Sequence, residues 1–164
     1  MNIILGIELD EEEAQKARNT NLAKSEILNT DFHEYCISTE KKFDLVIGNP
    51  PYIRYQYFNK DQQVYAASIF GKAGLSYSKL TNAWVSFVVG SSLLLKETGK
   101  IGFVLPAEIL QVSFAKQLRN FLSVFYNKIN IKSKLFTFQS NSNFGKTNFS
   151  IIPQNNSLNS NISF

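Results

Sequence analysis

The sequence predicts an α/β fold built on a doubly wound, mostly parallel sheet. Short apolar runs of strand length alternate along the chain with longer stretches of helical periodicity. The run FDLVIG (43–48) is apolar on both faces, as expected of a strand inside a parallel sheet. The spacing between the runs leaves room for the helical crossovers that join parallel strands.

The first expected elements are a strand, a helix and a second strand. IILGIEL (3–9) is a β-branched, apolar run, and Asp10 follows it as an N-cap for a helix over 11–23. Glu13 stands three residues after Asp10, as in a capping box, and acidic residues crowd the first turn where the helix dipole favours them. SEILNTDF (25–32) is a weaker candidate for the second strand.

The second half of the chain carries longer elements. After the third strand (43–48), a long helix is expected over 77–100, with Trp84 and Phe87 in the core and Gly99 as its C-cap. The remaining expected elements, in chain order, are a strand, a helix and a strand: 100–106, 109–126 and 127–132.

Composition limits the classes of protein to which the chain can belong. Its 164 residues, 44% of them hydrophobic, make about one globular domain with a substantial core. No apolar run reaches the roughly 20 residues of a spanning helix, and the first residues do not resemble a signal peptide. We therefore expect a cytoplasmic protein without a membrane partner. One cysteine, Cys36, and one histidine, His33, exclude an internal disulfide and a Cys/His metal site.

Charge is distributed unevenly along the chain. Residues 1–108 hold eleven Lys and Arg against thirteen Asp and Glu, whereas six basic residues and no acid follow Glu108. A segment of one sign attracts polyanions such as nucleic acid, although a polar tail that simply lacks acids accounts for the pattern equally well.

The character of the sequence changes at residue 133. The remainder is rich in Asn and Ser, with scattered phenylalanines and no sustained period. We therefore expect one folded region, 1–132, and a tail, 133–164, that is disordered or foreign to the fold.

The corner Asn49-Pro50-Pro51-Tyr52 directly follows the third expected strand and is the first candidate site. Ligands of open α/β sheets bind outside the carboxyl ends of the strands. The two prolines stop the strand, fix the backbone and remove two N–H donors while leaving carbonyl acceptors in place. Asn49 adds a side-chain carbonyl and Tyr52 an aromatic face. Two acceptors beside a stacking ring suit a planar group that carries an amino substituent.

This corner and its neighbours resemble a known enzyme family. NPPYIR after an apolar strand is similar to the catalytic motif of S-adenosylmethionine-dependent amino-methyltransferases, in particular the adenine-specific DNA methyltransferases of restriction-modification systems. LGIELDEEEAQKAR, NTDF and the stretch YSKLTNAWVSFVVGSSLLLKETGKIGFVLPAEILQ resemble further segments of that family in the same order. The likeness covers approximately residues 2–131.

The resemblance implies a Rossmann-like methyltransferase sheet and S-adenosyl-L-methionine as the co-substrate. It implies that Glu8 holds the ribose hydroxyls of the cofactor, that Asp31 accepts a hydrogen bond from its adenine amine, and that Phe32 packs on the adenine ring.

The resemblance also implies double-stranded DNA as the partner. Asn49 and the Pro50 carbonyl would accept hydrogen bonds from the target adenine amine, Pro51 would complete the rigid bend, and Tyr52 would stack on the flipped-out base. Two acceptors on the amine favour a tetrahedral nitrogen, which then attacks the sulfonium methyl directly.

The sequence departs from the family's pattern in two respects, since the expected target-recognition domain and one loop are both missing. The glycine-rich loop of the form D-P-x-C-G-x-G-x-F is absent, so we expect a sheet that lacks its first strand and that loop. GKAG (71–74) is no substitute because no strand precedes it. These absences favour a truncated gene remnant, read out of frame after about residue 132, or a chain completed by an upstream or companion polypeptide.

Each assignment has a structural alternative. NPPY also ends strands in ordinary turns, Glu8 also suits a polar strand end, NTDF also suits a turn, and His33 resembles a surface loop histidine. The cationic and aromatic residues after the corner suit a nucleic-acid groove or a docking surface for another domain: Arg54, Tyr55, Tyr57 and Phe58.

Three functions remain open from the sequence. The first is adenine-specific DNA methylation. The second is methylation of a protein glutamine or an RNA amine by the same chemistry, which the long insertion between Tyr52 and Tyr77 favours less. The third is a catalytically inactive, nucleic-acid-binding remnant.

Overall fold

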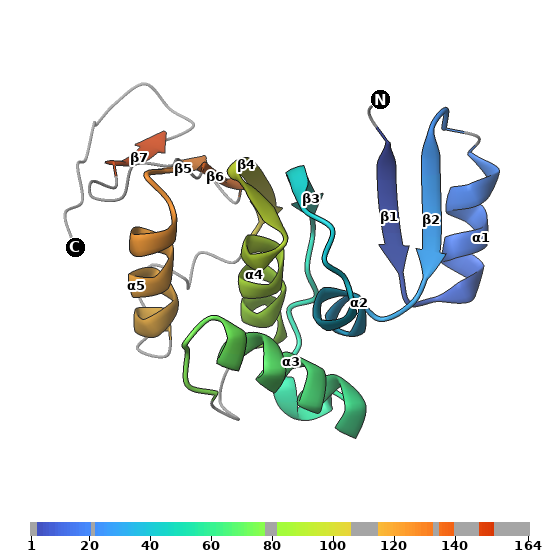
Figure 1. The fold of residues 1–164 in the computed structure, drawn as a ribbon, viewed down its shortest axis with the longest axis horizontal. Coiled ribbons are helices and arrows are strands. Elements are labelled where there is room, and N and C mark those ends of the chain that lie inside the picture. Colours follow the sequence, from blue (N-terminus) through green and yellow to red (C-terminus); the bar gives the residue numbers. More distant parts are fainter. Residues whose placement is uncertain are drawn as a thin grey trace.

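The computed structural model describes residues 3–20, 22–77, 82–105, 115–132, 135–139 and 148–152. Its strands form two sheets: a parallel pair, β1–β2, and a five-stranded sheet in the order β3-β4-β6-β5-β7. Figure 1 shows the two sheets side by side, with helices packed against them. The predicted α/β class with parallel strands is confirmed.

The first unit is β1 (Ile4–Glu8), α1 (Glu11–Asn19) and β2 (Ser25–Asn29). Asp10 caps α1 as expected, since its side chain accepts a hydrogen bond from the Glu13 amide at 3.0 Å. The strands are parallel with Glu8 opposite Asn29, so both carboxyl ends lie together. The helix is shorter than predicted because it ends at the C-cap Thr20.

Helix α2 (Phe32–Ser38) corrects the prediction for the second strand. The strand ends at Asn29 because Asp31 is the N-cap of α2, where it accepts hydrogen bonds from the His33 and Glu34 amides. Residues 31 and 32 therefore begin a helix rather than finish a strand.

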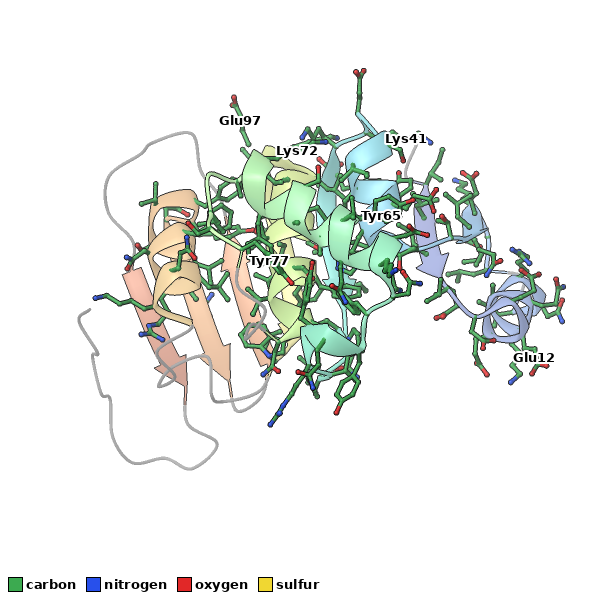
Figure 2. The ribbon with its side chains drawn as sticks, turned by 90° about the horizontal axis from the view of Figure 1, so that it is seen from below. Glu12, Lys41, Tyr65, Lys72, Tyr77 and Glu97 are labelled. Carbon is green, nitrogen blue, oxygen red and sulfur yellow. The ribbon has the colours of Figure 1, made fainter. Side chains whose placement is uncertain are left out.

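The second unit contains β3 (Phe43–Gly48), the 3₁₀ turn η1 (Tyr55–Tyr57), α3 (Lys60–Lys72), α4 (Ala83–Leu93) and β4 (Leu95–Val104). Strands β3 and β4 are parallel. Figure 2 shows α3 crossing in front of α2 and α4, and the three helices pack against one another.

The prediction of a helix over 77–100 with Gly99 as its C-cap is wrong. Helix α4 is capped at Leu94, and Gly99 lies inside β4. The register between β3 and β4 shifts between Phe43 and Leu45, and this irregularity places Gly99 close to its own strand. A Cβ on Gly99 would lie 2.9–3.0 Å from Leu95 atoms and 3.0 Å from the Lys96 carbonyl, which explains the glycine.

The last described elements are α5 (Ala115–Phe125), β5 (Lys128–Lys132), β6 (Leu135–Gln139) and β7 (Asn148–Ile152). Strand β6 is antiparallel to both β4 and β5, whereas β5 and β7 are parallel. β5 agrees with the predicted strand, and α5 occupies most of the predicted helix, whose first residues lie outside the described part. Within the predicted tail the structure describes β6 and β7; its boundary at 132 stays a prediction.

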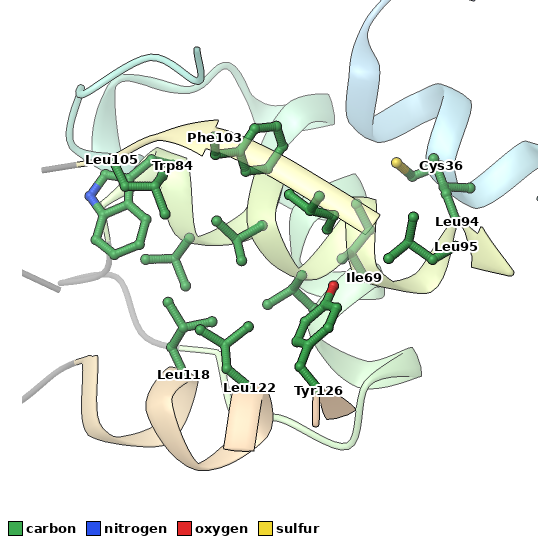
Figure 3. Close-up of a cluster of buried hydrophobic side chains, with 14 of the residues drawn as sticks. Cys36, Ile69, Trp84, Leu94, Leu95, Phe103, Leu105, Leu118, Leu122 and Tyr126 are labelled. Atoms are coloured by element: carbon green, nitrogen blue, oxygen red, sulfur yellow. The ribbon is translucent and has the colours of Figure 1, made fainter. Parts of the chain in front are cut away.

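The main core lies between α4, α5 and β4 (Figure 3). Trp84 is fully buried as predicted, and Leu118 and Leu122 of α5 face it. The Tyr126 hydroxyl donates to Ser92 Oγ at 2.7 Å, which satisfies a buried polar pair. Cys36 belongs to this core, and burial raises the pKa of its thiol to about 12, so no reactive thiolate is available.

Of the four strand edges that are unpaired within the described residues, two belong to β1 and β3, on the sides away from β2 and β4. Figure 1 shows these two strands as neighbours across the space between the sheets. Apolar side chains are exposed on both, with Ile4 at 51%, Leu45 at 57% and Ile47 at 73%.

No helix in the described ranges is both long and apolar enough to cross a membrane. In the same ranges no group of three or more His, Cys, Asp or Glu could hold a metal ion.

Candidate active site

The Asn49–Tyr52 corner lies over the carboxyl ends of β3 and β4. Gly48 allows the strands to approach, since a Cβ there would lie 3.0 Å from the Phe103 ring. The Tyr52 hydroxyl lies 3.0 Å from Asn49 Oδ1 and 2.8 Å from the carbonyl of Val104, the last residue of β4. One phenol hydrogen serves only one of these acceptors at a time, so Asn49 Oδ1 retains capacity for another donor.

Exposure differs among the four residues of the corner. Asn49, Pro51 and Tyr52 are exposed, and half of the Tyr52 surface is open. Pro50 is buried. Asn49 Oδ1 is therefore the more accessible of the two acceptors that the sequence predicts, and Tyr52 offers an open ring beside it.

The segment that follows the corner is held in place by buried side chains and by a backbone hydrogen bond. Tyr55 and Phe58 are buried and form a second apolar cluster with Ala66 and Ala83. The Ala83 amide donates to the Ile53 carbonyl at 2.8 Å. Tyr55 and Phe58 are therefore core residues, and neither a nucleic-acid groove nor a docking surface can use them directly.

Arg54 and Tyr57 lie on the other side of this segment. Both are exposed, and Tyr57 is 70% open. They leave a cationic and an aromatic side chain near the corner.

Asp31 is the most strongly held polar group near the strand ends. Its Oδ1 accepts hydrogen bonds from the amides of His33 at 2.7 Å and Glu34 at 3.2 Å, and its Oδ2 accepts from Gln62 Nε2 at 2.8 Å. Burial alone would raise the pKa of this carboxyl, but the hydrogen bonds from His33 and Gln62 outweigh it and lower the pKa far below its usual value. Asp31 is therefore an anion at neutral pH.

His33 is a buried polar residue, not the surface histidine that the sequence indicated. It is completely buried, and its Nε2 lies 2.7 Å from Ser86 Oγ. Its Nδ1 lies 3.3 Å from Asp31 Oδ1. The Ser86 hydroxyl donates in turn to the Ala83 carbonyl at 2.7 Å.

The other two predicted cofactor residues flank this region. Glu8 ends β1, and its carboxylate accepts a hydrogen bond from the Asp10 amide at 3.0 Å. Asn29 Nδ2 donates to the backbone carbonyl of Glu8 at 3.2 Å, which joins the ends of β1 and β2. Phe32 is half-buried, and one face of its ring stacks on Phe87 at 4.8 Å between centroids.

Gln62 is the residue of this region that sequence reasoning missed. It belongs to α3, a helix that was not predicted, and it reaches Asp31 across 31 positions of sequence. The local signal was the pair Asn59 and Gln62, whose spacing is that of a capping box and marks the start of a helix. Nothing in that local pattern indicated the contact with Asp31.

Comparisons with known proteins agree with this architecture. The family model described as the Eco57I restriction-modification methylase matches residues 2–144. Over 115 residues the chain is 33% identical to the type II restriction enzyme and methyltransferase RM.Eco57I of Escherichia coli, an alignment that covers 70% of the chain. The chain spans only 11% of the length of that relative.

Two solved structures share the fold. One is a Listeria monocytogenes protein assigned to the class I S-adenosylmethionine-dependent methyltransferases, with a TM-score of 0.68 and 14% identity over 92% of the chain and 49% of that protein. The other is a type I restriction-modification methyltransferase subunit of Streptococcus thermophilus, with a TM-score of 0.64 and 19% identity over 92% of the chain and 36% of that subunit.

The match to the family model extends over most of the chain. It includes Glu8, Asp31 and the Asn49–Tyr52 corner. S-adenosyl-L-methionine is the co-substrate of this class of methyltransferase. The chain belongs to the Eco57I restriction-modification methylase family.

Proposed function

We propose that this chain carries the target-base corner and the adenosine-binding residues of an adenine-specific DNA methyltransferase of a restriction-modification system. The observation that carries the proposal is the exposed pair of Asn49 and Tyr52 over the carboxyl ends of β3 and β4. An amide oxygen beside an open aromatic ring can hold a flipped base by its amine and its face.

The corner acts on the amine by accepting its hydrogens. Asn49 Oδ1 takes one hydrogen, which draws electron density onto a nitrogen whose lone pair is otherwise delocalised into the ring. In this proposal the Pro50 carbonyl accepts the second hydrogen of the amine. Pro50 is buried, so access to its carbonyl is limited. The nitrogen then forms a bond to the methyl carbon as the carbon–sulfur bond breaks, and the amine releases a proton.

The residues at the ends of β1 and β2 fit the adenosine part of S-adenosyl-L-methionine. Asp31 is an anion whose Oδ2 receives only one hydrogen bond in the described part of the chain, and a carboxylate oxygen accepts two. Glu8 adds a second carboxylate at the neighbouring strand end. Phe32 supplies an aromatic ring, one face of which already stacks on Phe87.

The methionine part of the cofactor finds no counterpart in the sequence, because the glycine-rich loop is absent. We propose that a companion or upstream polypeptide supplies a strand between β1 and β3 together with that loop. Both flanking strands belong to parallel pairs, so an inserted parallel strand continues their geometry.

Hydrogen-bond alternation identifies the groups that such a strand would meet. Ile4 uses its amide toward β2, so the peptide groups of Leu5 and Ile7 face the open edge. Phe43 uses its amide toward Leu94, so those of Asp44 and Val46 face the other open edge. Hydrogen exchange of these four amides is expected to slow when the companion segment binds. Unchanged exchange in an active complex would contradict this placement.

The test of function is transfer of a labelled methyl group. The chain is expressed with the polypeptide encoded immediately upstream of Met1, and unmethylated double-stranded DNA is the substrate. We expect N6-methyladenine in the digested DNA and its loss in Asn49→Ala. An active complex that yields another methylated base, or an unaffected Asn49→Ala variant, would refute the assignment.

Two other functions give different results in the same assay. Label in RNA or in a protein glutamine, with none in DNA, would identify the corresponding amino-methyltransferase. The inactive-remnant alternative predicts that residues 1–164 show no saturable binding of S-adenosyl-L-methionine in calorimetry, with or without the upstream polypeptide.

A further inference from the structure

One amide side chain, that of Gln62, joins Asp31 to the start of α3. Its Nε2 donates to Asp31 Oδ2 at 2.8 Å, and its Oε1 accepts from the Asn59 amide at 3.1 Å. Its own backbone amide donates to Asn59 Oδ1 at 2.8 Å, which completes the capping box. The orientation of the Gln62 amide is thus fixed, because a flip would place donor against donor at Asn59.

A second chain of hydrogen bonds runs from α2 to the other end of the same segment. His33 directly follows Phe32 in α2 and bonds Ser86 on α4. Ser86 donates to the Ala83 carbonyl, and the Ala83 amide donates to Ile53. Residues 53–59, which follow the corner, are therefore linked to α2 at both ends. Asn59 is linked through Gln62 to Asp31, and Ile53 is linked through Ala83 and Ser86 to His33.

We propose that Gln62 is a positioning residue that fixes residues 53–59, and with them the base-contacting corner, relative to Asp31. This inference rests on the proposed function, in which Asp31 meets the cofactor and Asn49 and Tyr52 meet the base. Neither end of the link is local to the other, since Asp31 precedes the corner and Gln62 follows it. The link therefore holds the proposed base-contacting residues in a fixed position relative to the proposed cofactor-contacting residue.

The arrangement has a testable chemical logic of donors and acceptors. In Gln62→Glu two carboxylates face each other, and in Asp31→Asn two amides compete for the same geometry. In the double variant Asp31→Asn/Gln62→Glu the donor and acceptor are exchanged, so the bond forms again with reversed polarity. Asn is also a good N-cap, so α2 keeps its cap.

The experiment is native-state hydrogen exchange of the full chain, measured by NMR at single amides. The reporters are the Tyr57 and Phe58 amides, which bond the Arg54 and Tyr55 carbonyls at 3.0 Å each. We expect Gln62→Leu and Gln62→Glu to speed their exchange about fivefold or more, the equivalent of one hydrogen bond of about 1 kcal/mol. The double variant should return them to within about twofold of the original chain.

Controls separate positioning from general loss of structure. The Tyr126 amide, bonded to Leu122 in α5, should be unchanged in every variant. Gln15→Leu removes an exposed glutamine contact in α1 and should leave Tyr57 and Phe58 unaffected. In Gln62→Glu the lost protection of these amides, taken relative to their intrinsic exchange rates at each pH, should return as the pH falls below about 4.3, where the new carboxyl becomes a donor. A purely structural role of the side chain predicts no such reversal.

Two results would overturn the inference: unchanged exchange at Tyr57 and Phe58 in both single variants, or no recovery in the double variant. Neither result involves methyl transfer. Failure of the proposed function with a successful exchange rescue would leave the link intact, and the reverse combination would remove Gln62 alone from the mechanism.

Discussion

Replacement of Asp31 by alanine should destabilise the chain in a way that depends on pH. The variant loses an N-cap of α2, worth about 1 kcal/mol, and a hydrogen bond from Gln62 to a charged group, worth about 1.5–3 kcal/mol. Because only 12% of the Asp31 side chain is exposed, solvent screens these contacts little. We therefore expect the free energy of unfolding to fall by about 2.5–4 kcal/mol at pH 7.

The sign of the pH dependence follows from the lowered pKa of Asp31 in the folded chain. A carboxyl group of this kind stabilises the fold above its unfolded pKa of about 3.9, and the contribution is lost as the pH falls toward the folded pKa. The difference between the original chain and Asp31→Ala should be constant above about pH 5. Below about pH 4 it should shrink by up to about 1.4 kcal/mol per pH unit.

Urea unfolding at a series of pH values measures this difference directly. At each pH, the free energy of unfolding of the variant is subtracted from that of the original chain, which cancels the contributions of all other carboxyl groups. Asp31→Asn, which keeps the cap but not the charge, should cost less than alanine at pH 7. An alanine penalty that is equal at pH 7 and pH 3 would refute the assignment of a depressed pKa to this group.

Three further outcomes are expected. Tyr126→Phe should lower the free energy of unfolding by about 1 kcal/mol, and Ser92→Ala by about 1–3 kcal/mol, because Ser92 Oγ makes two buried hydrogen bonds, to Tyr126 and to the Val88 carbonyl. A thermal melt that ranks the two variants in reverse would contradict the pairing. Leu122→Ala should cost about 2–5 kcal/mol in urea unfolding because Leu122 is buried in the main core, and a cost under about 1 kcal/mol would be inconsistent with that packing. In the active complex, Tyr52→Ala should weaken binding of DNA with a flipped 2-aminopurine by about 5- to 150-fold. Tyr52→Phe keeps the ring and should bind with nearly the original affinity. Equal losses of affinity in the two variants would exclude stacking as the role of Tyr52.

Local signals explain which parts of the fold the sequence predicted. β1, α1 and β3 were predicted because Asp10 caps a helix three residues before Glu13, and because FDLVIG is apolar except at Asp44. Asp31 and Glu34 have the same three-residue spacing, but the strand predicted from SEIL was continued through NTDF, and this concealed the start of α2. A capping pair is decisive only where the neighbouring pattern does not compete with it.

The prediction of the boundary between α4 and β4 was wrong for a different reason. The sequence LLLK suits the end of a buried helix and the start of a buried strand equally, so periodicity does not separate them. Gly99 then suggested a C-cap, whereas its role is to fit an irregular strand against Leu95.

In the candidate site, too, local contacts could be predicted from the sequence and tertiary contacts could not. Asn49 and Tyr52 are three residues apart, so their contact follows from a short motif. The contact of Asp31 with Gln62 depends on how α3 packs against α2, which no local pattern encodes. Short motifs therefore predict which chemical groups lie at the candidate site, and tertiary packing decides which other groups hold them in place.

The open edges of β1 and β3 make a last prediction about the chain by itself. Leu45 and Ile47 point away from the packed core with most of their surface in solvent, and a full burial of each would contribute about 1.5–3 kcal/mol. Unpaired backbone groups beside exposed apolar side chains are a template for pairing with another copy. Ile47→Lys should therefore reduce concentration-dependent association in analytical ultracentrifugation, while the urea midpoint of the monomer changes little because the side chain packs on almost nothing. Val124→Lys, which replaces an exposed apolar side chain on α5 instead of on an open strand edge, is the matched control. Equal association of all three chains would show that these edges are not where copies meet, and would weaken the case that they await a strand.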